Sequence, residues 1–242
     1  MKDEQIDALE KKYAIKFMPE HREFLKILHT IDRKERLEHK NDGEIIIEER
    51  PFFYNWLTDE EEIREKFEWP YRTILEDILG ANKVWLKSWG KRPASDEDKE
   101  AIFSTWFNKT PKLLPLTSHR FLVSDLNLED RPVLSIWGSD IIVYGWDLRL
   151  YLLNELSGYL DITEQVYYEE YQCYYAESIK EIKEINEKAH LDSVQKDIPY
   201  WKEMILFWTS GWGSFGQESP GNDGNTIQPI MPTYIAGNEE NN

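Results

Sequence analysis

One histidine, one arginine and one aspartate are the residues whose types could support acid–base chemistry in this chain. His119 and Arg120 are adjacent, and Asp140 follows in the same block of predicted strands. A carboxylate beside an imidazole can orient the ring and stabilise its charged form, as in a general acid–base pair. The structural alternative is that His119 bonds to a backbone group while Arg120 pairs with Asp140 or Glu129 at the rim of a sheet. We adopt the structural alternative and predict that the chain is not an enzyme.

Other catalytic and metal-binding patterns are missing from the sequence. It contains no nucleophile elbow, phosphate-binding loop, zinc-protease helix motif or dinucleotide fingerprint. The single cysteine, Cys173, lies among tyrosines with no base nearby in sequence, which predicts a buried thiol rather than a nucleophile. We therefore expect neither a cofactor nor a metal ion. The five histidines have no ligand spacing: His21, His29, His39, His119 and His190.

The charge of the chain is strongly acidic. It carries 29 basic and 46 acidic residues, for a formal net charge of −17, and no basic run long enough to follow a phosphate backbone. Nucleic acid is therefore not expected as a direct partner. An acidic protein attracts basic proteins and speeds their encounter, although the charge could equally serve solubility.

The sequence also predicts a cellular compartment. A single cysteine excludes an internal disulfide framework, which is typical of a reducing environment. Residues 1–10 are charged and lack the apolar segment of an export signal, and no apolar run approaches the ~20 residues that cross a bilayer. We expect a cytoplasmic protein without a membrane partner.

The clearest structural pattern lies in the middle of the chain. Residues 113–123 predict one strand. Residues 132–144 predict a hairpin that turns at Gly138 and Ser139, because glycine suits a two-residue turn between alternating apolar residues. After the hairpin the apolar period changes from 2 to 3.6, and Asp147 is placed to cap a helix. The block predicts strand, hairpin and helix in that order.

The flanking segments complete the predicted fold. We expect two amino-terminal helices, a brief edge strand at 44–49, an acidic helix ending at Phe67 and a β-meander over 71–89. Ser95 is predicted to cap the helix that leads into the central strands. The predicted class is α+β, with a mostly antiparallel sheet, helices packed on one face, an amino-terminal helical hairpin and carboxy-terminal acidic helices.

The carboxy-terminal third differs in composition. Residues 161–210 combine many glutamates with a stripe of tyrosines, which predicts an acidic, aromatic helical extension packed on a domain formed by residues 1–160. A tyrosine-lined ligand groove is the alternative. Residues 211–242 are rich in glycine, proline and asparagine and contain no lysine or arginine, so we predict a disordered tail.

A resemblance to a known family rests on the order of short motifs. The series PKLLPL, HRF, PV-S-I, D-II-YG and D-L-YL-NE, which starts at Pro111, resembles the carboxy-terminal half of the SUKH superfamily. Trp85 and the run WGKRP at 89–93 resemble the tryptophan-rich middle of a longer bacterial subgroup. The resemblance covers residues 4–160. This superfamily includes fungal Smi/Knr-type regulators of cell-wall synthesis and bacterial toxin-immunity proteins.

The resemblance implies a binding function. Bacterial members of the superfamily that this chain resembles bind a cognate secreted toxin, often a nuclease, and have no catalytic activity of their own. We therefore expect a basic toxin domain as the partner, with an intracellular regulator or scaffold as the alternative, and a homodimer through a strand edge is a further option. Aromatic anchors usually dominate such interfaces. Trp137 and Tyr144 are assigned to the core, and the candidate contact residues are Trp89, Trp146, Glu164, Glu169 and Glu170.

Overall fold

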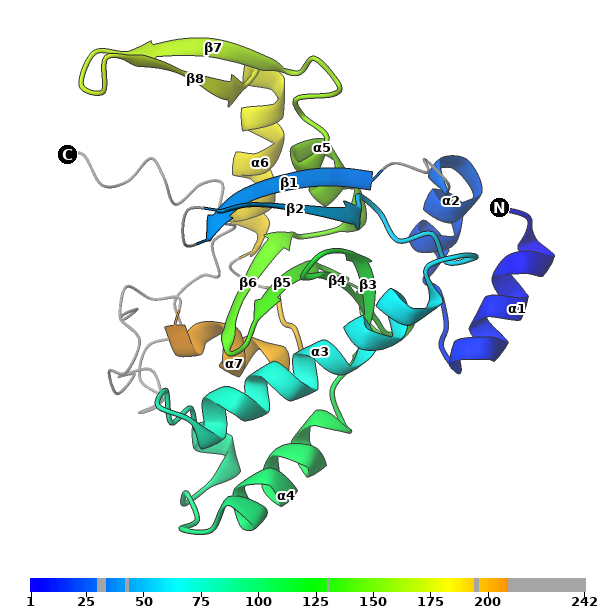
Figure 1. Cartoon of the computed structure of the whole chain (residues 1–242), viewed down its shortest axis with the longest axis vertical. Helices are drawn as coiled ribbons and strands as arrows, with labels where there is room; N and C mark the ends of the chain where they lie inside the picture. Colours follow the sequence, from blue (N-terminus) through cyan, green and yellow to red (C-terminus); the bar gives the residue numbers. More distant parts are fainter. Residues whose placement is uncertain (30–33, 42–43, 130, 194–195, 209–242) are drawn as a thin grey trace.

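An antiparallel four-stranded sheet forms the centre of the molecule (Figure 1). The computed structural model describes residues 1–29, 34–41, 44–129, 131–193 and 196–208. The strands follow sequence order across the sheet, and every neighbouring pair is antiparallel. The predicted α+β class and antiparallel sheet are confirmed. The strands are β3 (Lys112–Thr117), β4 (Arg120–Ser124), β5 (Val133–Trp137) and β6 (Asp140–Gly145).

Helices pack against the sheet, because alternate side chains of its strands are apolar on both faces. Phe121, Leu134 and Val143 lie in one core cluster with α3 (Glu60–Leu79), α4 (Asp96–Phe107) and α7 (Trp201–Trp208). Leu114 and Leu122 lie in a second cluster with residues of α1 (Asp3–Tyr13), α2 (Pro19–Leu28) and α5 (Leu148–Glu155). Helices thus cover one face, as predicted, and three further helices contribute to a core on the other.

The second core cluster contains a buried histidine. The His21 side chain is inaccessible to solvent, and its ring lies 4.8 Å from the ring of Phe17 and 6.1 Å from that of Trp56. Neither ring nitrogen has a hydrogen-bond partner. Burial lowers the pKa of His21 to about 3, because a charged imidazolium would be poorly solvated there.

Helix α7 completes the first cluster from far along the chain. Trp201, Met204 and Ile205 are fully buried and belong to the cluster that contains Ile141 and Val143 of β6. These α7 residues lie at positions i, i+3 and i+4, the spacing of one helical face, while Lys202 and Glu203 are only partly buried. The sheet therefore depends on residues near position 200 for part of its cover.

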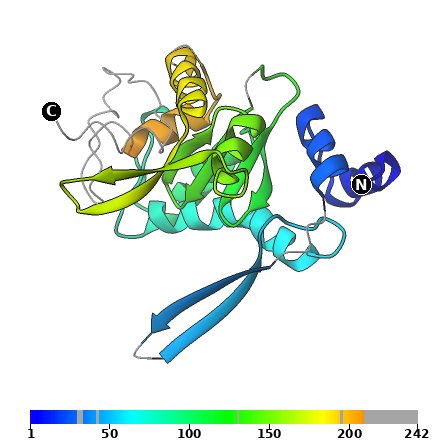
Figure 2. The same ribbon diagram turned by 90° about the horizontal axis from the view of Figure 1, so that it is seen from above.

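Two hairpins extend from this body in different directions (Figure 2). One pairs β1 (Lys34–Asn41) with β2 (Glu44–Pro51), which includes the brief strand predicted at 44–49; its partner β1 was not predicted. The other pairs β7 (Thr163–Tyr168) with β8 (Cys173–Ser178) and leads into α6 (Lys180–Ser193).

The strand predicted over 113–123 is in fact two strands. The chain turns at Ser118 and His119, where Ser118 adopts a left-handed backbone with φ 46°, and β4 returns alongside β3. Pro115 cannot donate a backbone hydrogen bond, and it lies where the register shifts in β3, an edge strand that tolerates proline. The prediction was wrong because the polar pair 118–119 is a turn.

The β-meander predicted over 71–89 is also wrong. Helix α3 continues through Pro70 to Leu79, and Ile63, Ile74 and Ile78 are buried at helical spacing. Pro70 removes one backbone donor, but tertiary burial of this face outweighs that cost. The segment after α3 is irregular apart from the short 3₁₀ turn η1 (Lys87–Trp89).

Three local predictions are confirmed by the structure. The β5–β6 turn occurs at Gly138 and Ser139, where Gly138 has φ 60°. The Asp147 carboxylate accepts a hydrogen bond of 2.7 Å from the backbone N–H of Leu150 at the start of α5. The Ser95 hydroxyl accepts one of 3.2 Å from Asp98 at the start of α4.

The tyrosine-rich segment is a hairpin rather than a helix. Residues 163–178, predicted to be helical, form β7 and β8, whereas α6 and α7 follow later in the extension. The predicted disordered tail, residues 211–242, lies outside the described residues.

Candidate protein interface

The three residues considered for acid–base chemistry have structural contacts. The Arg120 guanidinium donates a hydrogen bond of 2.6 Å to the Ser135 hydroxyl, and its carbon lies 3.7 Å from the centre of the Tyr144 ring. The described residues include no ion pair between Arg120 and Asp140 or Glu129, so that predicted pairing is wrong. His119 bonds to the neighbouring hydroxyl, Nδ1 to Ser118 Oγ at 3.1 Å.

Asp140 lies next to a carboxylate that fixes the β5–β6 turn. The Asp77 carboxylate accepts hydrogen bonds from the backbone N–H of Ser139 at 2.6 Å and from its hydroxyl at 2.7 Å. A Cβ at Gly138 would collide with that carboxylate, so glycine is required by the turn and by this contact. Asp140 is itself exposed; partial desolvation by its neighbours, and then the charge of Asp77, raise its pKa. The Asp77 carboxylate thus attaches the turn to α3.

The two tryptophans predicted as interface anchors are part of the core. Trp89 is 9% exposed and packs edge-on against Trp85 and Trp106, with ring centres 5.1 and 5.4 Å apart. Trp146 is 1% exposed. Both side chains therefore belong to the core, contrary to their predicted place at an interface.

Trp137, assigned to the core, is instead exposed. It lies at the end of β5 with 60% of its surface accessible, and its ring is 5.4 Å from that of Trp69 and 5.6 Å from that of His119. Tyr144 is half-buried beneath the Arg120 guanidinium. Trp137 and Tyr144 are accessible because they lie near the ends of β5 and β6, where their residue type does not decide burial.

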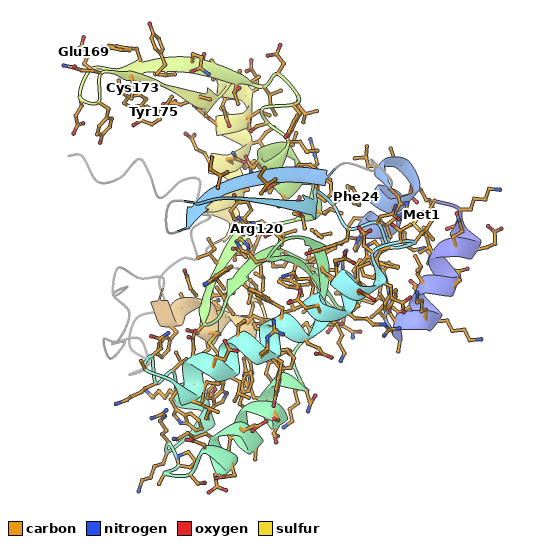
Figure 3. The ribbon with its side chains drawn as sticks, viewed as in Figure 1. Met1, Phe24, Arg120, Glu169, Cys173 and Tyr175 are labelled. Carbon is orange, nitrogen blue, oxygen red and sulfur yellow. The ribbon has the colours of Figure 1, made fainter. Side chains whose placement is uncertain are left out.

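The predicted acidic contact residues lie together on the β7–β8 hairpin. Glu164 is in β7, and Glu169 and Glu170 form the start of the turn, which closes at Gln172 with φ 51°. Figure 3 shows Glu169 at the turn end, with Cys173 and Tyr175 beside it and Arg120 far from them. No lysine, arginine or histidine occurs in residues 150–179, which contain six acidic residues: Glu155, Asp161, Glu164, Glu169, Glu170 and Glu177.

The hairpin has two chemically different faces. We call the first the anchored face; it carries Glu164 and Glu177 at its base and the rings of Tyr168 and Tyr175 nearer the turn. We call the second the outer face; it carries the Tyr167–Tyr174 pair, with ring centres 5.0 Å apart, and no charged residue. Side chains on both faces are exposed or only partly buried. The hairpin is therefore an accessible surface on both sides.

A lysine on α6 holds the anchored face. The Lys183 ammonium lies 2.6 Å from the Glu177 carboxylate and 3.7 Å from that of Glu164. The hydrogen bond to Glu177 raises the pKa of Lys183, and Lys183 in turn lowers the pKa of Glu177. The Tyr168 hydroxyl also donates to Glu177. These contacts fix the base of the hairpin and leave its turn end accessible.

Three tyrosine rings cluster at the turn end on the anchored face. The centres of Tyr168 and Tyr175 are 5.4 Å apart, and Tyr171 lies 5.9 Å from Tyr175 and 6.4 Å from Tyr168. Tyr171 and Tyr175 are each about half exposed. Cys173 is only partly buried, and its neighbouring thiol raises the pKa of Tyr175. The prediction of a buried thiol was therefore wrong.

Neither the Lys183 contact nor the ring cluster was predicted from the sequence. The signal was available in YYEEYQCYY, residues 167–175, where a polar run between two tyrosine pairs is typical of a hairpin turn. Lys183 gave no such signal, because its contact depends on how the hairpin lies on α6.

Other sites are limited. Among the described residues, no group of three or more histidine, cysteine, aspartate or glutamate side chains is placed to hold a metal ion. A groove of about 190 Å³ lies between the end of α1 and the start of β3, lined by Tyr13, Phe67, Phe107 and Lys112. None of the helices in the described part of the chain has the length and apolarity to span a bilayer.

Comparisons with known proteins give no match. No protein-family model, curated protein or solved structure is significantly similar to this chain.

Proposed function

We propose that this chain is a non-catalytic binding protein whose β7–β8 hairpin contacts a basic protein domain. The observation that carries this proposal is the hairpin itself: a segment that projects from the body, exposes tyrosine rings and glutamates, and contains no basic residue. An isolated two-stranded hairpin is marginally stable in water, so a large exposed one is more readily explained by a partner than by folding alone.

Charge and aromatic content support a basic partner. Acidic residues steer the encounter with a basic surface, at rates that fall as salt increases. Tyrosine supplies contact area at low conformational cost, which suits it to carry affinity after the encounter. The SUKH resemblance suggests that the basic partner is a cognate toxin domain, which the protein would neutralise by covering its active surface in the cytoplasm.

The test compares two charge reversals of equal size. Glu169→Lys with Glu170→Lys changes the turn end, and Glu61→Lys with Glu62→Lys changes two exposed carboxylates on α3 by the same net charge. Tagged wild-type and variant proteins capture partners from native lysate and secreted fraction, and cross-linking identifies the contacted residues. We expect a basic protein cross-linked to the hairpin that is lost from the first variant and kept by the second.

If both variants lost the partner equally, the acidic residues of the hairpin would act only through the net charge of the protein. Cross-links that avoid residues 161–178 would refute the placement of the interface on the hairpin.

A further inference from the structure

We propose that the turn end of the hairpin selects arginine over lysine side chains of the basic partner, by stacking guanidinium groups on Tyr171 and Tyr175. This inference rests on the proposed function and names the chemistry of its contact. The two rings are about half exposed, and Glu169 and Glu170 lie in the same turn with exposed carboxylates. An aromatic face next to a carboxylate offers both kinds of contact that a guanidinium makes.

The orientation of the tyrosine cluster favours contact through the ring faces. The Tyr168 hydroxyl donates to Glu177, so the polar end of this ring already has a partner within the hairpin. The Tyr171 and Tyr175 rings are nearly perpendicular, with an interplanar angle of 83°. A cation at the cluster would therefore meet one ring by its face and the other by its edge, and it gains most over the face.

Arginine fits this arrangement better than lysine. A guanidinium is planar and weakly hydrated, stacks on tyrosine and can donate two parallel hydrogen bonds to one carboxylate, whereas an ammonium is a compact and strongly hydrated charge. The same chain places guanidinium groups over tyrosine rings elsewhere: the guanidinium carbon of Arg120 lies 3.7 Å from the centre of the Tyr144 ring, and that of Arg64 lies 5.3 Å from the centre of the Tyr13 ring. Electrostatic attraction alone would not distinguish arginine from lysine, so a preference for arginine would show that the tyrosine rings take part in binding.

The test measures the dissociation constants of oligo-arginine and oligo-lysine peptides of equal length for the full chain by calorimetry, at one salt concentration. We expect the arginine peptide to bind about two- to fivefold tighter, the factor that an exposed cation–π contact provides. Tyr171→Ala with Tyr175→Ala should remove that preference and leave the affinity for oligo-lysine nearly unchanged.

A matched control lies on the outer face. Tyr167→Ala with Tyr174→Ala removes two tyrosines from the other face of the same hairpin, and the preference for arginine should persist. Equal affinities of the wild type for both peptides, or equal loss of preference in both variants, would overturn this inference. Binding of both peptides that depends on Glu169 and Glu170 but not on the tyrosines would refute the selection and keep the basic partner. Binding of neither peptide, with an oligo-glutamine peptide as the baseline, would refute both.

Discussion

Acid should destabilise this protein through one buried histidine. His21 is enclosed by the rings of Phe17, Phe24 and Trp56, without a hydrogen-bond partner for either nitrogen. Its pKa in the folded chain is about 3, against about 6.5 for an exposed histidine. The unfolded chain therefore binds a proton that the folded chain does not, and the contribution of His21 to stability, complete above pH ~6.5, falls as the pH decreases toward 3.

The size of the effect follows from the two pKa values. At about pH 5 the pH lies ~1.5 units below the pKa of the unfolded histidine, which is therefore protonated, while the folded histidine is still neutral. Each pH unit in this window corresponds to about 1.4 kcal/mol of stability. The free energy of unfolding should therefore fall by about 2 kcal/mol between about pH 7.5 and about pH 5 because of this residue alone. Most carboxylates titrate below that window, which separates their effect from that of the imidazole.

The assay is urea unfolding followed by tryptophan fluorescence across this pH range. His21→Phe removes the titrating group and should flatten the pH dependence by about 2 kcal/mol, whatever it does to stability at neutral pH. Phe24→Leu, on the same helix and in contact with the same ring, is the control: it should lower stability at every pH and keep the wild-type slope. Burial, and then the charge of the amino terminus, lower the pKa of His29 to about 4. His29 therefore adds its own pH dependence of stability, which is the same in all three proteins.

One result would refute this reasoning. If His21→Phe showed the wild-type slope with an unchanged dependence on urea concentration, the imidazole would be charged or solvated in the folded chain, contrary to its enclosure by three rings.

Two further predictions concern the turn and the hairpin. Asp140→Asn should slightly raise the urea midpoint at neutral pH, because partial desolvation and the nearby charge of Asp77 raise the pKa of the exposed Asp140 and so disfavour its charged form. The same sign predicts that wild-type stability increases as the pH falls toward that pKa, and a lower midpoint in the variant would contradict it. Lys183→Met should increase the rate of amide hydrogen exchange in residues 163–178. The free energy of global unfolding should change by no more than ~1 kcal/mol, as expected for a partly exposed ion pair. Unchanged exchange would show that the Glu177 contact does not order the hairpin.

Local signals were sufficient where structure depends on neighbouring residues. The turn at Gly138 and the caps at Ser95 and Asp147 were predicted correctly, because each needs only a few adjacent residues with specific chemistry. The first part of α3 was predicted as a helix ending at Phe67, but its continuation to Leu79 was missed. Pro70 and an isoleucine-containing run favour interruption and strand there, whereas burial of the isoleucine face against the sheet decides for a helix.

The candidate interface was predicted in part. The sequence singled out Glu164, Glu169 and Glu170, and the structure places all three on one exposed hairpin. Neither face of that hairpin is buried, so the apolar–polar alternation that identifies most strands is missing from residues 163–178. Trp89 and Trp137 were assigned to the wrong environments, because exposure of a tryptophan depends on tertiary packing that no local pattern records.

The burial of α7 against β6 has a consequence for how the protein is made. Ribosomes deliver β6 well before residues 201–208, so Ile141 and Val143 emerge without the helix that shields them in the finished molecule. A nascent chain of this kind exposes aggregation-prone apolar surface until α7 is synthesised and packs against it, and chaperones bind such surface. A premature stop codon between the two segments would leave this surface permanently open and yield a product destined for aggregation or proteolysis.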